Sequence, residues 1–148
     1  SQLQVSRVYD PYPYDYIFCF GDKAERKREL NGYNRGFFKT YHDDYIKIHK
    51  GIFERGDIDD EITQDLSKIN KNKIEVIKKL DTYSIGILIL TTICDIAEHY
   101  KVPVNKVYKC FKQPDIQNQL ALLKDMTEYK SKSRITPDEA YKRYKSLV

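Results

Sequence analysis

The longest apolar stretch of the chain lies in its second half and has helical spacing. From Ile74 to Tyr100 the pattern is mainly helical, and between Ile85 and Ile96 apolar residues fall on nearly all sides of a helical projection. A helix that is apolar all round is buried on all sides in a folded protein. We therefore expect a central buried helix over 85–96, surrounded by other helices.

Shorter helices are expected on both sides of this segment. Asp22 is placed to cap a helix over Lys23–Leu30, which would end at Asn31-Gly32 because glycine permits a left-handed exit. Thr136-Pro137-Asp138-Glu139 has the pattern of a capping box and predicts the start of the last helix. The remaining expected helices cover 37–48, 59–69, 105–111 and 116–129. Since no segment alternates convincingly with a period of two, the expected fold class is all-α.

The opening of the chain combines prolines with tyrosines. Pro11 and Pro13 each disfavour helical geometry in the residue before them, so we expect an extended loop over 1–21. Aromatic side chains are enriched at protein interfaces. The tyrosines of this loop are therefore candidates for contact with a peptide or a protein partner: Tyr9, Tyr12, Tyr14 and Tyr16.

Composition favours one compact domain with a solvated surface. The 148 residues are 41% hydrophobic and 32% charged, and a chain of this length buries roughly 70% of its unfolded surface. The net charge is +4; residues 1–74 carry 13 basic and 13 acidic side chains, and residues 75–148 carry 13 and 9. Because acids interleave with the lysines even in the second half, we expect no nucleic-acid partner.

The cysteines, the histidines and the hydropathy indicate the compartment of the protein and which metal and membrane partners to expect. Three cysteines without a Cys-x-x-Cys pair indicate reduced thiols, and hence a cytoplasmic or other reducing compartment. The three histidines lack zinc spacing, so no metal site is expected. The apolar run Thr82–Cys94, bounded by Asp81 and Asp95, is shorter than the roughly 20 residues that a bilayer requires, so no membrane partner is expected.

Two stretches resemble landmarks of the C-terminal lobe of protein kinases. Leu80-Asp81-Thr82-Tyr83-Ser84-Ile85-Gly86, followed by an apolar run, is similar to the family's Asp-x-Trp/Tyr-Ser-x-Gly motif, which opens the buried helix of the lobe. Leu122–Ala140, with Arg134-Ile135-Thr136, is similar to the family's last landmark, Leu-x-x-x-Met-Leu-x-x-Asp-Pro-x-x-Arg-Ile-Thr-x-x-Glu-Ala. The resemblance implies structural roles for Asp81, Ser84, Gly86 and Arg134.

The opening resembles a third landmark. Tyr12-Pro13-Tyr14-Asp15 lies where kinases carry Ala/Pro-Pro-Glu at the end of the activation segment, and some viral kinase-like proteins have a Tyr-Pro-Pro-Glu version. In kinases this Glu pairs with the arginine that Arg134 matches. The resemblance therefore implies a bidentate ion pair between Asp15 and Arg134, sheltered by the tyrosines at 12, 14 and 16. Without that pair, Arg134 is expected to be an exposed turn residue.

Two of these positions also have interpretations that do not depend on the family. Asp81 stands at the start of a helix, where a carboxylate accepts first-turn N–H groups and is favoured by the helix dipole. Gly86 would let another backbone or ring approach the helix closely, although glycine costs about 1 kcal/mol of helix propensity relative to alanine.

The resemblance covers only part of a kinase. Phosphoryl transfer requires a Gly-rich loop, a phosphate-binding Lys, a catalytic Asp and a magnesium-binding Asp-Phe-Gly motif, and the sequence carries none of these. We therefore expect a fragment or truncated relative of a serine/threonine kinase lobe that is inert as this chain. ATP and magnesium would be cofactors only if a missing N-terminal part exists. The expected partner is the remainder of a kinase domain or another protein.

The alternative function is that of a small helical structural or assembly protein, for example a virion component. Richness in Lys, Ile, Asn and Tyr is typical of A/T-rich coding genomes, which include large DNA viruses. In either case we expect a single domain over 1–148, with the loop over 1–21, a helical insertion over 22–72 and kinase-lobe-like helices over 73–148. The insertion is inferred because 65 residues separate Asp15 from Asp81, far more than in ordinary kinases.

Overall fold

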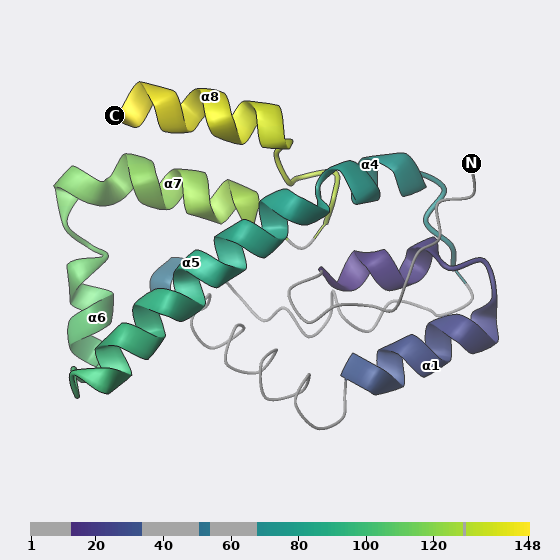
Figure 1. The fold of residues 1–148 in the computed structure, drawn as a ribbon, viewed down its shortest axis with the longest axis horizontal. Helices are drawn as coiled ribbons and strands as arrows, with labels where there is room; N and C mark the ends of the chain where they lie inside the picture. Colours follow the sequence, from purple (N-terminus) through teal and green to yellow (C-terminus); the bar gives the residue numbers. More distant parts are fainter. Residues whose placement is uncertain (1–12, 34–50, 54–67, 129) are drawn as a thin grey trace.

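The structure is a computed structural model, and it describes residues 13–33, 51–53, 68–128 and 130–148. All regular structure within these residues is helical, which confirms the all-α class for the described part of the chain. The elements are η1 (Tyr14–Cys19), α1 (Lys23–Tyr33), α4 (Lys73–Lys78), α5 (Leu80–His99), α6 (Val104–Cys110), η2 (Pro114–Ile116), α7 (Gln117–Met126) and α8 (Pro137–Leu147) (Figure 1).

The opening is a short 3₁₀ helix over 14–19, and the expected extended loop is wrong there; residues 1–12 lie outside the described part. Pro13 is itself extended, with φ −71° and ψ 154°. The N–H of Tyr16 then donates to the carbonyl of Pro13 at 3.1 Å. Proline restricts the residue before it, so the residues after Pro13 are free to turn. Burial of Ile17 and Phe18 stabilises that turn.

Helix α1 begins where the sequence predicts. The carboxylate of Asp22 accepts a hydrogen bond from the N–H of Ala24 at 2.9 Å, which confirms the expected cap. The predicted end at Asn31-Gly32 is wrong, because the helix continues to Tyr33. A single glycine costs only about 1 kcal/mol inside a helix and does not force an exit.

Helices α4 and α5 form one nearly continuous rod with a break at Lys79, which agrees with the helix predicted over 74–100. One side of this rod makes the main core with η1. Ile17, Val76 and Leu90 are fully buried there. The other buried members of this core are Tyr16, Cys19, Phe20, Leu80, Tyr83 and Ile87.

The expected burial of 85–96 on all sides is wrong. Ile85, Leu88, Ile89 and Ile96 are between 41% and 53% exposed; we call these four residues the outer face of α5. Among the described elements, α5 contacts α4, α7 and α8, which leave this side uncovered (Figure 1). Apolar composition all round therefore does not mean burial here, because the described neighbours pack on one side of the helix only.

The C-terminal helices form a second layer. Helices α7 and α8 lie side by side and antiparallel (Figure 1), and they bury Leu122, Met126 and Ala140 between them. The predicted capping box is present in one half: the N–H of Glu139 donates to Thr136 Oγ1 at 3.2 Å. The Glu139 carboxylate reaches back to the Thr136 hydroxyl, which donates to Oε1 at 3.2 Å, and not to the Thr136 main-chain N–H that a full capping box uses. This cap begins α8 at Pro137, as the sequence predicts.

The region expected to be an insertion is described only in part. The predicted helix over 37–48 and most of the helix predicted over 59–69 lie outside the described residues, and 68–70 are not helical. Ile52 and Phe53 pack against the main core. The N–H of Asn70 donates to the carbonyl of Phe18 at 2.7 Å. The assignment of 22–72 as an insertion remains a prediction.

One helical stretch, Lys73–His99, is long and apolar enough to cross a membrane by length and composition. This stretch is longer than the run 82–94 considered from the sequence, because the helix continues through polar residues on both sides. A third of its most apolar window is buried within the protein. The core helix of a soluble protein passes the same test, so this single helix is weak support for a membrane span.

Candidate functional site

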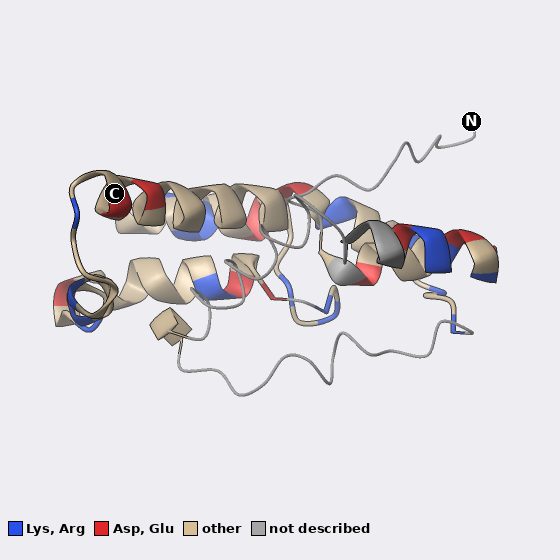
Figure 2. Cartoon of the chain, turned by 90° about the horizontal axis from the view of Figure 1, so that it is seen from below, with Lys and Arg blue, Asp and Glu red and all other residues tan. Residues whose placement is uncertain are grey.

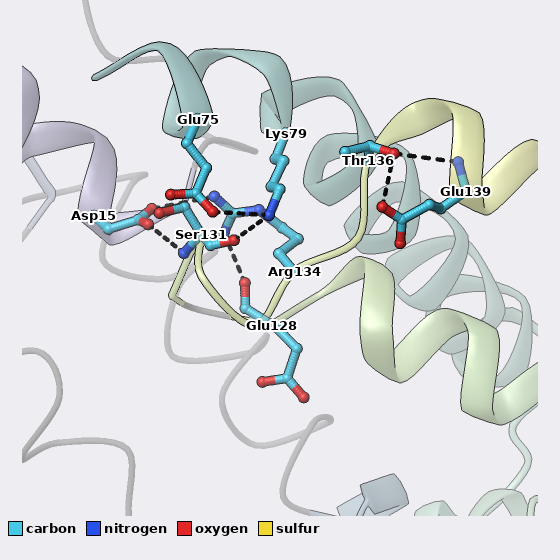
Figure 3. Close-up of polar contacts among 8 residues, drawn as sticks. All are labelled: Asp15, Glu75, Lys79, Glu128, Ser131, Arg134, Thr136 and Glu139. Atoms are coloured by element: carbon cyan, nitrogen blue, oxygen red, sulfur yellow. Dashed lines mark hydrogen bonds and ion pairs between the residues drawn. The ribbon is translucent and has the colours of Figure 1, made fainter. Parts of the chain in front are cut away.

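A cluster of mostly buried polar groups joins η1 to the turn before α8 (Figure 3). Asp15, in the first turn of η1, is 8% exposed. Its Oδ2 accepts a hydrogen bond from the main-chain N–H of Ser131 at 2.7 Å, and its Oδ1 lies 3.4 Å from Nη2 of Arg134. The predicted contact between Asp15 and Arg134, 119 residues apart, is therefore present.

Arg134 is the largest fully buried side chain of the described residues, at 1% exposure, so it is not an exposed turn residue. Its Nη1 donates to the carbonyl of Glu128 at 2.7 Å, and the guanidinium lies 5.4 Å from the ring centroid of Tyr83 on α5. The expected bidentate geometry is wrong. Because Oδ2 of Asp15 is directed to the Ser131 N–H and Nη1 of Arg134 to Glu128, the two charges meet through Oδ1 and Nη2 instead of through two parallel hydrogen bonds.

The predicted sheltering of the pair by the tyrosines at 12, 14 and 16 remains a prediction; the ring that lies near Arg134 among the described residues is that of Tyr83. Tyr16 is 3% exposed and lies edge-on to Phe20, with ring centroids 5.6 Å apart. It belongs to the core and is not available as a contact residue for a partner. Tyr9 and Tyr12 lie outside the described residues, and so does the side chain of Tyr14.

Lys79 also belongs to the cluster, although no motif in the sequence pointed to it. Its Nζ donates to the carbonyl of Ser131 at 2.6 Å and lies 3.2 Å from Oε1 of Glu75 (Figure 3). The residue sits at the break between α4 and α5 and is 9% exposed. The i,i+4 spacing of Glu75 and Lys79 was the available signal. This spacing could not show that Lys79 also donates to the carbonyl of Ser131, since that contact spans 52 residues.

Burial dominates the electrostatics of the acid in this cluster. Removal from water raises the pKa of Asp15 above its ordinary 3.8, while the Arg134 charge and the hydrogen bond from Ser131 act in the opposite direction. Burial raises the pKa of the neighbouring Cys19 thiol to about 12, and the Asp15 charge adds to that effect. This thiol is therefore protonated and unreactive at neutral pH.

The raised pKa of Asp15 predicts a pH dependence of stability. The folded protein binds the Asp15 proton more tightly than the unfolded chain, so this contribution is fully present below pH 3.8 and is lost as the pH rises through the folded-state pKa. Subtracting the free energy of unfolding of Asp15→Asn from that of the unsubstituted protein isolates the contribution of Asp15 to the pH dependence. We expect this difference to fall with rising pH from about 3.8, and a flat or rising difference would contradict the assignment.

The kinase-like residues of α5 have unequal surroundings. Asp81 is exposed, and the helix begins one residue earlier, at Leu80, with Lys79 as the N-cap. Asp81 is therefore not the N-cap, although it lies in the first turn of α5, where the helix dipole favours a carboxylate as expected. Ser84 is buried, and its hydroxyl donates to the carbonyl of Leu80 at 3.0 Å, within its own helix.

Gly86 marks a close approach between α5 and the end of α7, as the sequence predicts. A Cβ at this position would lie 2.5 Å from Cγ2 of Thr127 and 3.3 Å from Cβ of Met126. Thr127 cannot move away easily, because it is fully buried and its hydroxyl bonds the Leu123 carbonyl at 2.8 Å.

We expect Gly86→Ala to destabilise the protein by up to about 2 kcal/mol. Overpacking costs roughly 1–3 kcal/mol, and the higher helix propensity of alanine offsets about 1 kcal/mol of that. The matched control is Gly21→Ala, since no atom lies within 4 Å of a Cβ built there. Urea unfolding of both variants measures the effect. Equal stability of the two would mean that α7 does not approach α5 this closely.

The cluster can hold chain segments together, and its geometry favours no reaction. Among the described residues no group of three or more His, Cys, Asp or Glu side chains could hold a metal ion. The three cysteines are all described and form no disulfide. The acid and the two bases of the cluster are turned toward one another and toward carbonyls, instead of toward a cavity. The contacts of the cluster join η1, the break between α4 and α5 and the turn before α8.

The chain was also compared with known proteins. No family model, no curated protein and no solved structure matches it.

Proposed function

We propose that the chain is part of a protein-kinase-like C-terminal lobe and is catalytically inert by itself. The observation that carries the proposal is the buried contact between Asp15 and Arg134. That contact was inferred by matching two separate motifs, at opposite ends of the chain, to the same family. A chance match of either motif alone gives no reason for these two side chains to meet.

Two further features support the proposal. Gly86, in the Asp-x-Tyr-Ser-x-Gly stretch, is the point where α7 approaches α5, so this helix organises the described helices around it. The exposed carboxylate of Asp81 and the outer face of α5 form an uncovered surface. In the proposal, the remainder of a kinase domain covers this surface.

We expect the isolated chain neither to bind Mg·ATP nor to transfer phosphate, because the groups that hold the nucleotide and its metal are missing from the sequence. Isothermal titration calorimetry of the chain with ATP and magnesium measures this directly. Micromolar, magnesium-dependent binding would contradict the expectation of inertness.

The kinase-like assignment is tested on the full reading frame that contains this chain. We expect glycine-loop, catalytic-loop and magnesium-loop motifs upstream of Ser1 and phosphorylation of serine or threonine in a generic peptide by the complete polypeptide. Arg134→Gln should lower that activity through loss of the folded lobe. A reading frame without these motifs would leave the fold proposal resting on Asp15 and Arg134 alone and would favour the second candidate.

The second candidate is a helical assembly protein, for instance a virion component in a reducing compartment. The exposed apolar and aromatic surface favours it: the outer face of α5 is uncovered, and Tyr141 and Tyr144 on α8 are 61% and 59% exposed. Sedimentation velocity of the chain with extracts of its source, followed by crosslinking at residues 141 and 144, would identify a stable protein complex. A monomer at all concentrations, with no crosslinked protein, would argue against this candidate.

A further inference from the structure

The turn between α5 and α6 carries exposed apolar side chains at the end of the molecule opposite α1 (Figure 1). We call residues 96–109 the α5–α6 corner. Ile96, Tyr100 and Val104 are 53%, 73% and 55% exposed, and Val102 between them is 38% exposed. Helix α6 contains no buried residue. The corner is therefore an apolar projection, which is unfavourable to leave in water.

The backbone holds this projection in one conformation. Helix α5 ends in a Schellman arrangement, in which the N–H of Val102 donates to the carbonyl of Ala97 at 2.8 Å and the N–H of Lys101 donates to that of Glu98 at 3.0 Å. Lys101 adopts φ 54° and is the one described non-glycine residue with positive φ. Glycine is favoured at such positions, so a lysine there costs some backbone strain. It also places a long side chain at the tip of the corner.

The corner is also basic. Residues 99–112 contain four lysines and no acid. Lys101, Lys106 and Lys109 are exposed. Figure 2 shows basic and acidic segments together at this end of the molecule. Two acids lie beside or within the corner in the sequence: Asp95 directly precedes Ile96, and Glu98 lies two residues from both Ile96 and Tyr100. Of these two acids, Glu98 is the one that belongs to the corner. At about 100° per residue it is therefore on the opposite side of α5 from them.

We propose that the α5–α6 corner docks on an anionic membrane surface. Tyr100, Val102 and Val104 enter the interfacial layer, where tyrosine is favoured. The lysines extend to the headgroups, since their long stems lie along apolar surface while their charges stay in the polar layer. Exposed apolar side chains and lysines on one corner match the two layers of such a surface, since apolar groups enter the interface and lysines meet anionic headgroups.

The proposal does not rest on the kinase-like assignment, because the polar cluster takes no part in it. Of the outer face of α5, only Ile96 belongs to the corner. The first test is cosedimentation of the chain with vesicles of phosphatidylcholine alone or with about a third phosphatidylserine. We expect binding only to the anionic vesicles, weakened by salt. The triple substitution of Gln for Lys101, Lys106 and Lys109 should lower the partition coefficient by about 100-fold, at roughly tenfold or less per lysine.

The matched control is the triple substitution of Gln for Lys27, Lys132 and Lys142, which are exposed and lie on other elements. It changes the net charge equally and should leave most of the vesicle binding intact. If the control loses binding as fully as the corner variant, attraction depends on net charge alone and the proposal fails. Circular dichroism shows whether either triple variant has lost vesicle binding because it is unfolded. In that case Tyr100→Trp, which removes no charge, tests whether the corner contacts the vesicles.

The chain has no tryptophan, so Tyr100→Trp introduces a single fluorophore at the tip. Anionic vesicles should shift its emission to shorter wavelength as the indole leaves water, whereas Tyr144→Trp on α8, at a similarly exposed position, should show no shift. An unshifted emission from the Tyr100→Trp variant would overturn the proposal. Binding of the corner to an acidic polypeptide such as polyglutamate, with no binding to anionic vesicles, would also overturn it and would indicate a protein partner.

Discussion

Replacing Arg134 by glutamine is expected to lower the free energy of unfolding by about 3–5 kcal/mol. Arg134 is fully buried and faces Asp15, which is nearly buried. Removing one partner of a buried pair leaves the other charge without compensation, and this costs far more than the roughly 0–1 kcal/mol of an exposed pair. The variant also loses the hydrogen bond to the Glu128 carbonyl and the contact with the Tyr83 ring.

A double-mutant cycle separates the pair from these other contacts. Asp15→Asn and Arg134→Gln, alone and together, are compared by denaturant unfolding. We expect a coupling free energy above about 1 kcal/mol, because Nη2 of Arg134 and Oδ1 of Asp15 lie 3.4 Å apart in a buried site. Asparagine keeps an acceptor for the Ser131 N–H, so Asp15→Asn mainly removes the charge. Additive effects would show that the two charges do not meet in solution, and the activation-segment assignment of the opening would then fall.

The second large effect is expected in α5, where neighbouring residues differ sharply in burial. Leu90 is fully buried in the main core, and Ile89 is 41% exposed on the outer face. Leu90→Ala should cost about 2–5 kcal/mol, since it removes buried methyl groups and leaves a cavity. Ile89→Ala should cost less than about 1 kcal/mol, because much of that side chain is already in water and alanine favours helix.

The two alanine variants serve as controls for each other, because they shorten side chains of equal size at adjacent positions of one helix. Chemical denaturation of the purified chain gives both values under the same conditions. Similar large losses would mean that the outer face of α5 is covered in solution, by another part of this chain or by a second copy. Sedimentation velocity would distinguish these two causes.

Local features were predictable from the sequence because short-range chemistry sets them. The cap at Thr136 and the cap at Asp22 depend on side chains within a few residues of the bonds that they make. The all-α class follows from spacing within single segments. The exit expected at Asn31-Gly32 was wrong, because glycine permits a helix end without requiring one, and the local pattern could not rank the two outcomes.

The candidate site was predictable only where a resemblance supplied long-range information. Neither spacing nor composition relates Asp15 to Arg134; two family-like motifs did so, and the contact is present. The hydrogen bonds from Ser131 and Lys79 could not be anticipated in this way, because they join main-chain groups of the turn to distant side chains. Because one carboxylate oxygen of Asp15 accepts from the Ser131 N–H and Nη1 of Arg134 donates to the Glu128 carbonyl, the expected bidentate geometry does not form.

By itself, the sequence determined the existence of α1, α5, α6, α7 and α8, where two of the helices are capped and that α5 is apolar. Only the tertiary structure decided which side of α5 is buried, since burial depends on where α4, α7 and α8 lie and not on the composition of the helix. The same holds for the opening, where the prolines predict an extended backbone. Packing of Ile17 and its neighbours on the core turns it into a 3₁₀ helix and carries Asp15 to Arg134.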